Sequence, residues 1–150
     1  SKRPDFDIFG IDIVPNMIEL AQKNNPNASF ALIDSRNIDE IKTKFDGIVC
    51  GFCLPYLSQE DSQKLITDCS NLLKENGLIY ISFVEGDPNK SGFQSGSSGD
   101  RCYFYFHQLE NLKNMIIENE FENLKIFKVE YQKSDNEKDI HTILTAKKVR

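Results

Sequence analysis

An acidic residue, Asp12, stands at the end of a mostly apolar run and directly before an amphipathic helix pattern. Residues Phe6–Ile11 are rich in β-prone apolar side chains, which predicts a short buried strand. In nucleotide-binding α/β folds, a carboxylate at the carboxyl end of a strand accepts hydrogen bonds from ribose hydroxyls. The carboxylate of Asp12 is therefore a candidate for binding the ribose of a nucleoside. The competing interpretation is an ordinary helix-capping aspartate before Pro15.

Other residues that could do chemistry also follow predicted strands. Asp34 and Ser35 come directly after the apolar run 29–33 and could instead only form a turn. Glu85 follows the run 78–84 and His107 follows an aromatic run, so these two are the candidates for a general base. A lone histidine is more often a surface or capping residue. His141, inside the last predicted strand, indicates a structural role.

The four cysteines, at positions 50, 53, 69 and 102, do not form a recognisable metal motif. Cys50 and Cys53 have C-x-x-C spacing, but the second C-x-x-C or His pair that a zinc site needs is absent from the sequence. Cys50 also lies in an apolar strand pattern and Cys69 on a helix face, where a thiol behaves as a small hydrophobic group. The sequence therefore predicts no metal.

Strand and helix patterns alternate through the first half of the chain. Met17, Leu20 and Ala21 recur at helical spacing after Pro15, which fits the first turn of a helix. Ser58 predicts an N-cap for a second helix, which Asn76-Gly77 is expected to end. That helix carries one apolar face: Leu65, Ile66, Cys69, Leu72 and Leu73. Strands are predicted over 29–33, 45–52 and 78–84, and this alternation predicts a parallel sheet covered by helices on both faces.

The second half of the chain breaks the alternation. Residues 86–99 contain four glycines and four serines, which predicts a flexible loop without regular structure and of the kind that can cover an active site. A helix is predicted from Leu109 to Ile117. Two strands, 124–131 and 140–146, are joined by too few residues for a crossover helix, so they are expected to be antiparallel. The fold class is α/β, with a Rossmann-like, mostly parallel sheet and a C-terminal antiparallel strand pair in one domain, 1–150.

The composition is that of an ordinary soluble protein, and it narrows the range of partners. The 150 residues carry a net charge of −5 with both signs interspersed, which argues against nucleic acid as the main partner because such binding depends on basic patches. No apolar run is long enough to cross a bilayer. The short charged start is not followed by a signal-peptide core, so the cytoplasm is the expected compartment.

The segment Asp-Ile-Val-Pro-Asn-Met-Ile-Glu-Leu-Ala, residues 12–21, resembles the corresponding segment of class I S-adenosylmethionine-dependent methyltransferases. The resemblance covers the chain from Phe6 onward and includes the final antiparallel strand pair. The family's first strand and Gly-x-Gly-x-Gly loop, which precede the acid by about 20 residues in the dinucleotide-binding pattern, have no counterpart here. The resemblance therefore implies an N-terminally incomplete domain whose sheet lacks its middle strand.

The resemblance implies a role for each matching position in the nucleoside half of the cofactor site. Asp12 matches the acid that binds the ribose. Ile13 and Met17 match apolar positions against the adenine ring, although either could equally be a core residue. Asp34 matches the acid that accepts from the adenine amino group, and Ser35 matches its neighbour whose backbone lies near the ring.

Further along the chain, Gly51 and Phe52 match the segment whose backbone lines the methionine half of the cofactor. A glycine there permits close approach of the backbone, which also suits a plain strand end. Tyr56 matches a wall of the methyl-transfer pocket, and Tyr103 and Tyr105 are further candidates for contact with substrate; packing is the alternative for each.

The implied activity is methyl transfer from S-adenosylmethionine to an acceptor of unassigned identity, which we expect to be a small molecule. Two alternatives compete with it. A non-catalytic relative that uses the fold for protein contact is favoured by the missing glycine loop. A nicotinamide-dependent oxidoreductase would suit Asp12, but Asp34 and the final antiparallel strands do not fit it.

Overall fold

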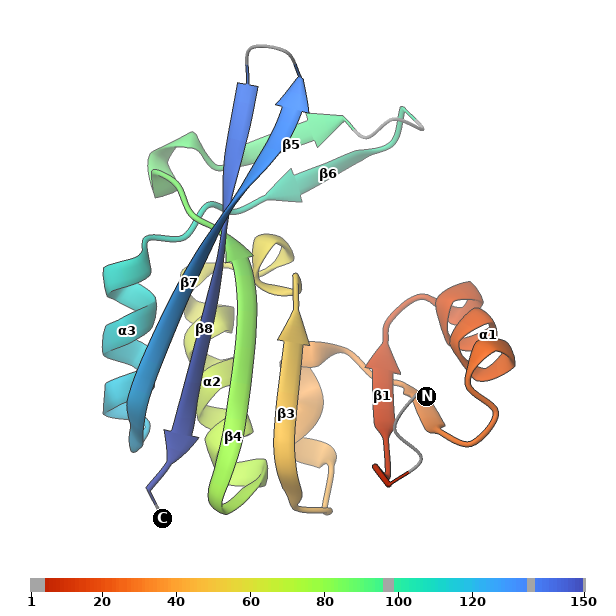
Figure 1. The fold of residues 1–150 in the computed structure, drawn as a ribbon. Coiled ribbons are helices and arrows are strands. Elements are labelled where there is room, and N and C mark those ends of the chain that lie inside the picture. Colours follow the sequence, from red (N-terminus) through yellow and green to blue (C-terminus); the bar gives the residue numbers. More distant parts are fainter. Residues whose placement is uncertain (1–4, 96–98, 135–136, 150) are drawn as a thin grey trace. The chain divides into compact units, whose positions relative to one another are not determined.

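The computed structural model describes residues 5–95, 99–134 and 137–149 (Figure 1). The chain divides into two compact units, Ser1–Glu40 (unit 1) and Ile41–Arg150 (unit 2). The single domain expected over 1–150 stays a prediction.

Unit 1 is a strand–helix–strand element followed by a short 3₁₀ segment. Its elements are β1 (Phe9–Asp12), α1 (Pro15–Asn24), β2 (Ser29–Leu32) and η1 (Ser35–Glu40). The two strands are parallel, in a register that pairs Phe9 with Ser29 and Asp12 with Leu32. The first helical residue is Pro15, as the sequence predicts, because its fixed φ and missing N–H suit that position.

Unit 2 contains a mixed four-stranded sheet and a separate two-stranded sheet. Its elements are β3 (Phe45–Gly51), η2 (Leu54–Tyr56), α2 (Gln59–Leu72), β4 (Leu73–Val84), η3 (Pro88–Lys90), β5 (Gly92–Ser95), β6 (Arg101–Phe104), α3 (Leu109–Glu118), β7 (Phe121–Ser134) and β8 (Glu137–Lys148). The strand order of the larger sheet is β3-β4-β8-β7 (Figure 1). Its β3 and β4 are parallel. Over the described residues, β1 pairs with β2 alone and β3 with β4 alone.

The C-terminal strands are antiparallel to each other, which confirms the prediction. β8 pairs antiparallel with both β4 and β7. Both strands are longer than the apolar runs that predicted them, since the pairing of β7 and β8 continues as far as Ser134 and Glu137. Backbone pairing does not require apolar side chains, so the apolar pattern underestimates the strand length.

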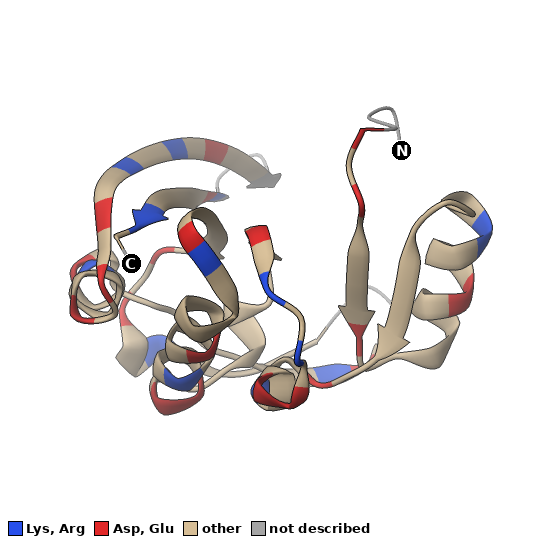
Figure 2. Ribbon diagram, turned by 90° about the horizontal axis from the view of Figure 1, so that it is seen from below, with Lys and Arg blue, Asp and Glu red and all other residues tan. Residues whose placement is uncertain are grey.

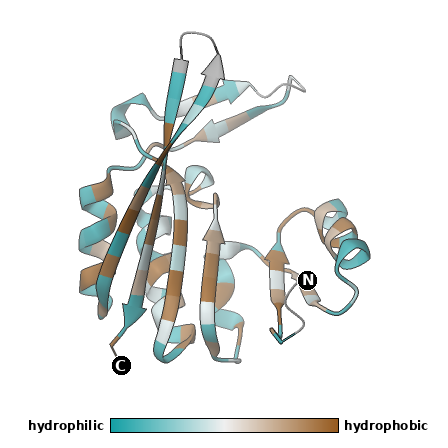
Figure 3. Ribbon diagram, in the orientation of Figure 1, coloured by the Kyte–Doolittle hydropathy of each residue, from teal (hydrophilic) through white to brown (hydrophobic). Residues whose placement is uncertain are grey.

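The core of unit 2 lies between one face of the four-stranded sheet and the helices α2 and α3, which lie next to each other behind it in Figure 1. The apolar face predicted for α2 is buried in full, from Leu65 to Leu73. The strands contribute Ile79, Ile81, Phe83 and Leu144, each at most 1% exposed. On β4, Ile79, Ile81 and Phe83 recur at every second position and so share one face of the strand, and Figure 3 shows hydrophobic bands along the strands of this sheet.

The helix α2 begins as predicted and ends earlier than predicted. The Ser58 hydroxyl accepts a hydrogen bond from the Asp61 N–H at 3.0 Å, so Ser58 is the N-cap. The helix ends at Leu72, because Leu73 is already extended and pairs with Phe45 of β3. The assignment of Asn76-Gly77 as the helix stop is therefore wrong. Asn76 does have a left-handed backbone, with φ of 63°, but it turns the chain within β4.

The prediction of an irregular loop over residues 86–99 is wrong for part of that segment. Residues Gly92–Ser95 form β5, which pairs antiparallel with β6. Glycine and serine discourage a strand locally, but the aromatic residues opposite supply cross-strand contacts that outweigh this preference: Phe93 faces Tyr103. Residues 96–98 lie outside the described residues.

Charged residues of both signs are interspersed along the elements, and Figure 2 shows no element of the described chain that carries one sign alone over a long stretch. No helix among the described residues is long and apolar enough to cross a membrane.

Candidate cofactor and substrate site

The carboxyl ends of β1 and β2 place two predicted site residues at one edge of the unit 1 sheet. The strands are parallel, and the Ile33 N–H donates to the Asp12 carbonyl at 3.1 Å. Asp34 directly follows Ile33 in the sequence. Asp12 and Asp34 therefore both lie at the carboxyl-terminal edge of this two-stranded sheet. This is the edge at which open parallel sheets bind ligands.

Asp12 fixes the start of α1 and keeps part of its carboxylate available. Its Oδ1 accepts from the Val14 N–H at 2.8 Å, as in an Asx turn. Val14 is the N-cap, and no side chain caps the helix. No hydrogen bond to Asp12 Oδ2 occurs within the described residues. The turn-forming role and the ribose-binding role are therefore compatible, since they use different oxygens.

Ile13 and Met17 present apolar surface close to Asp12 in the sequence. Their side chains are 58% and 49% exposed, and α1 buries none of its residues. Exposed apolar groups beside a carboxylate fit an adenosyl group, which has a flat hydrophobic base and a hydroxylated sugar.

Asp34 is held by Arg36, a residue that the sequence reasoning did not consider. The guanidinium Nη2 lies 2.6 Å from Asp34 Oδ2, and Nε contacts both carboxylate oxygens at 3.0 Å. These side-chain hydrogen bonds lower the pKa of Asp34, with a smaller effect of the Arg36 backbone N–H. Asp34 is therefore a firmly ionised acceptor. Ser35, half-buried, begins η1 directly after it.

In unit 2, Gly51 and Phe52 lie at the carboxyl end of β3. A Cβ added at Gly51 would meet no atom within 4 Å, so protein packing does not require glycine there. Phe52 has a left-handed backbone, with φ of 53°, which is unusual for a bulky residue and is held by a hydrogen bond from its N–H to the Ser82 hydroxyl at 3.0 Å. The open space beside Gly51 and the strained turn after it suit a backbone that a ligand approaches.

The three tyrosines predicted to contact substrate belong to connected segments of unit 2. Tyr56 is 60% exposed, and its ring lies edge-on to Phe104 with centroids 6.4 Å apart. The rings of Tyr103 and Tyr105 are 4.6 Å apart. The Tyr105 N–H donates to the Pro55 carbonyl at 2.7 Å, which ties this aromatic segment to the one after β3.

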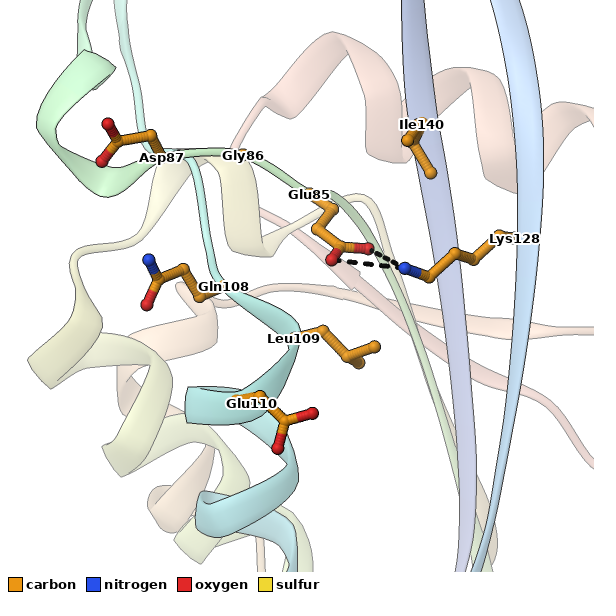
Figure 4. Close-up of a pocket in the computed structure, with 8 residues that line it drawn as sticks. All are labelled: Glu85, Gly86, Asp87, Gln108, Leu109, Glu110, Lys128 and Ile140. Atoms are coloured by element: carbon orange, nitrogen blue, oxygen red, sulfur yellow. Dashed lines mark hydrogen bonds and ion pairs between the residues drawn. The ribbon is translucent and has the colours of Figure 1, made fainter.

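Glu85, at the carboxyl end of β4, lines an open pocket of about 630 Å³ with Lys128 (Figure 4). Its carboxylate is 3.0 Å from Lys128 Nζ and accepts from the Thr142 hydroxyl at 3.0 Å. The other lining residues are Gly86, Asp87, Gln108, Leu109, Glu110 and Ile140. Neither Lys128 nor Thr142 could be connected with Glu85 from the sequence, because both lie more than 40 positions away on other strands.

His107 is buried and forms a structural link. It is 5% exposed, and its Nε2 lies 2.8 Å from the Leu54 carbonyl oxygen, to which it donates when protonated there. Its backbone forms a bridge with Glu85. Burial lowers the pKa of His107, and the neighbouring backbone carbonyls oppose this effect only in part. This geometry favours a structural role for His107 over that of a general base.

The low pKa of His107 predicts a loss of stability in mild acid. The folded-state pKa lies below the ordinary value of 6.5, so the unfolded chain takes up a proton first as the pH falls. The stabilising contribution is full above the unfolded pKa and is lost as the pH falls through the folded one, by at most about 1.4 kcal/mol per pH unit.

The measurement is the urea concentration at the midpoint of unfolding, at about pH 7.5 and at about pH 5.5. We expect the urea midpoint of the wild type to be lower at the acidic pH, and we expect this decrease to be smaller in His107→Gln. His141→Gln, the control at the other histidine, should behave like the wild type, and equal drops in all three proteins would contradict the role of His107.

The cysteines are placed as small hydrophobic groups. Cys50 and Cys69 are buried, with their sulfur atoms 3.9 Å apart. The hydrogen bond with Cys53 lowers the pKa of Cys50, but the contact with Cys69 and burial together outweigh it and raise that pKa. The hydrogen bond with Cys50, followed by burial, raises the pKa of Cys53, so both thiols are protonated at neutral pH. No group of three or more His, Cys, Asp or Glu side chains in the described part of the chain is arranged to hold a metal ion.

Comparison with known families gives a match over residues 1–77, to the model described as a methyltransferase domain. A demethylmenaquinone methyltransferase of Thermotoga maritima is 29% identical over 80 residues, a match that covers 53% of this chain and 34% of that protein. The match thus spans about a third of the length of this curated relative.

Solved structures show the same fold at low sequence identity. An S-adenosylmethionine-dependent methyltransferase from Methanosarcina mazei has a TM-score of 0.74 and 15% identity, with 95% of this chain and 82% of that chain covered. The N-methyltransferase NodS from Bradyrhizobium japonicum, in complex with S-adenosyl-L-homocysteine, has a TM-score of 0.68 and 14% identity, with coverage of 96% and 67%. These likenesses extend over almost the whole chain, including the antiparallel strand pair.

Proposed function

The chain belongs to the class I S-adenosylmethionine-dependent methyltransferases, and from this we propose that it binds S-adenosylmethionine and transfers its methyl group to a small-molecule acceptor. The cofactor of this family is S-adenosylmethionine. The observation that carries the proposal is the shared sheet edge of unit 1, where Asp12 and Asp34 follow parallel strands beside the exposed side chains of Ile13 and Met17.

We assign the nucleoside contacts to unit 1. Asp12 accepts hydrogen bonds from the ribose hydroxyls through the oxygen that Val14 does not use. Asp34, oriented by Arg36, accepts from the adenine amino group, and the backbone of Ser35 lies near the ring. Ile13 and Met17 cover the base. Each assignment matches the chemistry of the bound group: carboxylates accept hydrogen bonds from the ribose hydroxyls and the adenine amino group, and apolar side chains contact the flat adenine ring.

We assign the contacts with the methionine half to Gly51 and Phe52 of unit 2, and contacts with the acceptor to Tyr56. When bound, the cofactor supplies an activated methyl group on a sulfonium, so the protein mainly has to orient the acceptor and exclude water. Orientation alone can be worth about 7–11 kcal/mol in favourable cases. Glu85 is the better placed of the two candidate bases, because its carboxylate lines a pocket whereas His107 is buried.

A small-molecule acceptor is supported by charge and by similarity. The net charge of −5 argues against nucleic acid as the main partner, because such binding depends on basic patches. The Thermotoga maritima relative is a methyltransferase that acts, by its name, on demethylmenaquinone. Methyl transfer is the part of that activity that we carry over to this chain.

The test of the proposed function is calorimetric titration of the protein with S-adenosylmethionine, S-adenosylhomocysteine and a nicotinamide dinucleotide. We expect saturable binding of the first two and none of the third. Binding of the dinucleotide alone would replace the proposal with an oxidoreductase, and binding of none of the three would reject it.

Gly51→Ala is expected to weaken S-adenosylmethionine binding about tenfold with little change in stability. The added methyl group meets no protein atom, so any loss of affinity reports a ligand that approaches the backbone. The matched control is Gly47→Ala in the same strand, where the added Cβ would have only an ordinary contact at 3.6 Å with the Leu78 carbonyl. Both variants are titrated with the cofactor and unfolded in urea. Equal cofactor affinities in the two variants would contradict the role of Gly51.

A further inference from the structure

Four side chains on the β5–β6 hairpin and just after it form a continuous row, which we call the aromatic ladder: Arg101, Phe93, Tyr103 and Tyr105. The Arg101 guanidinium lies 5.1 Å from the centroid of the Phe93 ring. Phe93 and Tyr103 are direct cross-strand partners, with ring centroids 5.2 Å apart. Tyr105 extends the row at 4.6 Å from Tyr103. Each ring therefore orients the next.

The aromatic ladder is on the side of the hairpin that does not pack. Phe104 and Phe106 alternate with the tyrosines and contact each other at 5.1 Å, and Phe106 closes on Gly86, where a Cβ would be only 2.6 Å from its ring. In contrast, Phe93 is 66% exposed and Tyr103 is 39% exposed. One side of the hairpin thus packs against other parts of unit 2, and the other side presents the rings of Phe93 and Tyr103 to solvent. Contiguous exposed aromatic surface of this kind is typical of binding sites.

The aromatic ladder is anchored to the segment that follows β3. The Tyr105 N–H donates to the Pro55 carbonyl, and Tyr56 lies against Phe104 of the same hairpin. Gly51 and Phe52, assigned above to the methionine half of the cofactor, precede this segment by only a few residues. A ligand stacked on the ladder would therefore lie on an element fixed to the methyl-donor side of unit 2.

We propose that the aromatic ladder binds the methyl acceptor, and that this acceptor is a planar aromatic molecule with an anionic oxygen substituent. Flat rings stack on tyrosine and phenylalanine in the offset and edge-on arrangements that the ladder already shows. Arg101 supplies the complementary charge, because its planar fork of donors suits a carboxylate or phenolate. The acceptor role depends on the proposed function, whereas ring binding by the ladder does not.

The test is calorimetric titration of the protein with naphthoate, with its saturated counterpart decahydronaphthoate, and with naphthol. We expect naphthoate to bind about tenfold more tightly than the saturated acid, because several ring contacts each contribute about twofold to tenfold. Tyr103→Leu keeps an apolar side chain but removes a ring, and should weaken naphthoate binding about fivefold. Arg101→Gln should weaken binding of naphthoate and leave that of naphthol unchanged.

The matched control is Tyr131→Leu. Tyr131 is 55% exposed and stacked on His141, so it is an ordered surface tyrosine outside the ladder. Its loss should leave naphthoate binding unchanged. Equal binding of the saturated acid, or equal losses in Tyr103→Leu and Tyr131→Leu, would overturn the ladder as the site. Titration of the same variants with S-adenosylmethionine separates the two proposals. Cofactor binding without naphthoate binding overturns the ladder alone, and naphthoate binding without cofactor binding overturns the acceptor role.

Discussion

Asp12→Ala is expected to weaken S-adenosylmethionine binding by about 100-fold or more, since two hydrogen bonds from ribose hydroxyls to a carboxylate are worth about 1.5–3 kcal/mol each. The carboxylate has an oxygen available for them, because only Oδ1 is engaged by the Val14 N–H. Binding is measured by calorimetric titration of the wild type and the variant under the same conditions.

Two further variants show whether the loss comes from the ribose contact. Asp12→Asn keeps an acceptor for the Val14 N–H but loses the charge, so its affinity should fall between those of the wild type and the alanine variant. Asp7→Ala removes an exposed carboxylate of the same unit just before β1 and should bind like the wild type. An alanine variant at position 12 with wild-type affinity would remove the ribose assignment.

Phe83→Ala is expected to destabilise unit 2 by about 3–5 kcal/mol, because it removes a buried ring from a packed core and leaves a cavity. Phe83 is 0% exposed and lies on β4, between β3 and β8. The measurement is urea unfolding followed by tyrosine fluorescence. The chain has five tyrosines and no tryptophan, and all five tyrosines lie after position 41, so this signal reports unit 2.

The control for Phe83 is another phenylalanine of the same sheet. Phe127 on β7 is 52% exposed, so Phe127→Ala should cost about 1 kcal/mol or less. Similar losses for the two variants would mean that the side of the sheet facing α2 and α3 is not the main core of the unit.

Local patterns predicted the parts of the fold that depend on local interactions. The apolar spacing of α2, the Ser58 cap and Pro15 at the start of α1 each involve residues within a few positions of one another. The antiparallel C-terminal strands were also predictable, because the short polar connection leaves no room for a crossover.

The errors arise where distant partners decide the local structure. β5 forms from a glycine- and serine-rich segment because Phe93 pairs with Tyr103 across the hairpin. The helix α2 ends at Leu72 because the next residue, Leu73, pairs with Phe45 of β3. Phe45 lies 28 positions before Leu73 in the sequence. Composition within a short window carries no information about such partners.

In the candidate site, too, some residues could be identified from local sequence patterns and others could not. Asp12, Asp34 and Gly51 were identifiable because each follows an apolar strand pattern, and Arg36 could have been added from its spacing of two residues from Asp34. Lys128 and Thr142 could not, because the sheet brings them to Glu85 from strands far along the chain.

The different exposure of the cysteines allows transient opening of the core of unit 2 to be followed by thiol alkylation. Cys102 is exposed, whereas Cys69 is 0% exposed and its neighbour Cys50 is 8% exposed. An alkylating reagent should therefore modify Cys102 in the native protein and reach Cys69 only when the layers that cover it separate. The time course of labelling at Cys69 would then follow the transient exposure of this core, without any added dye.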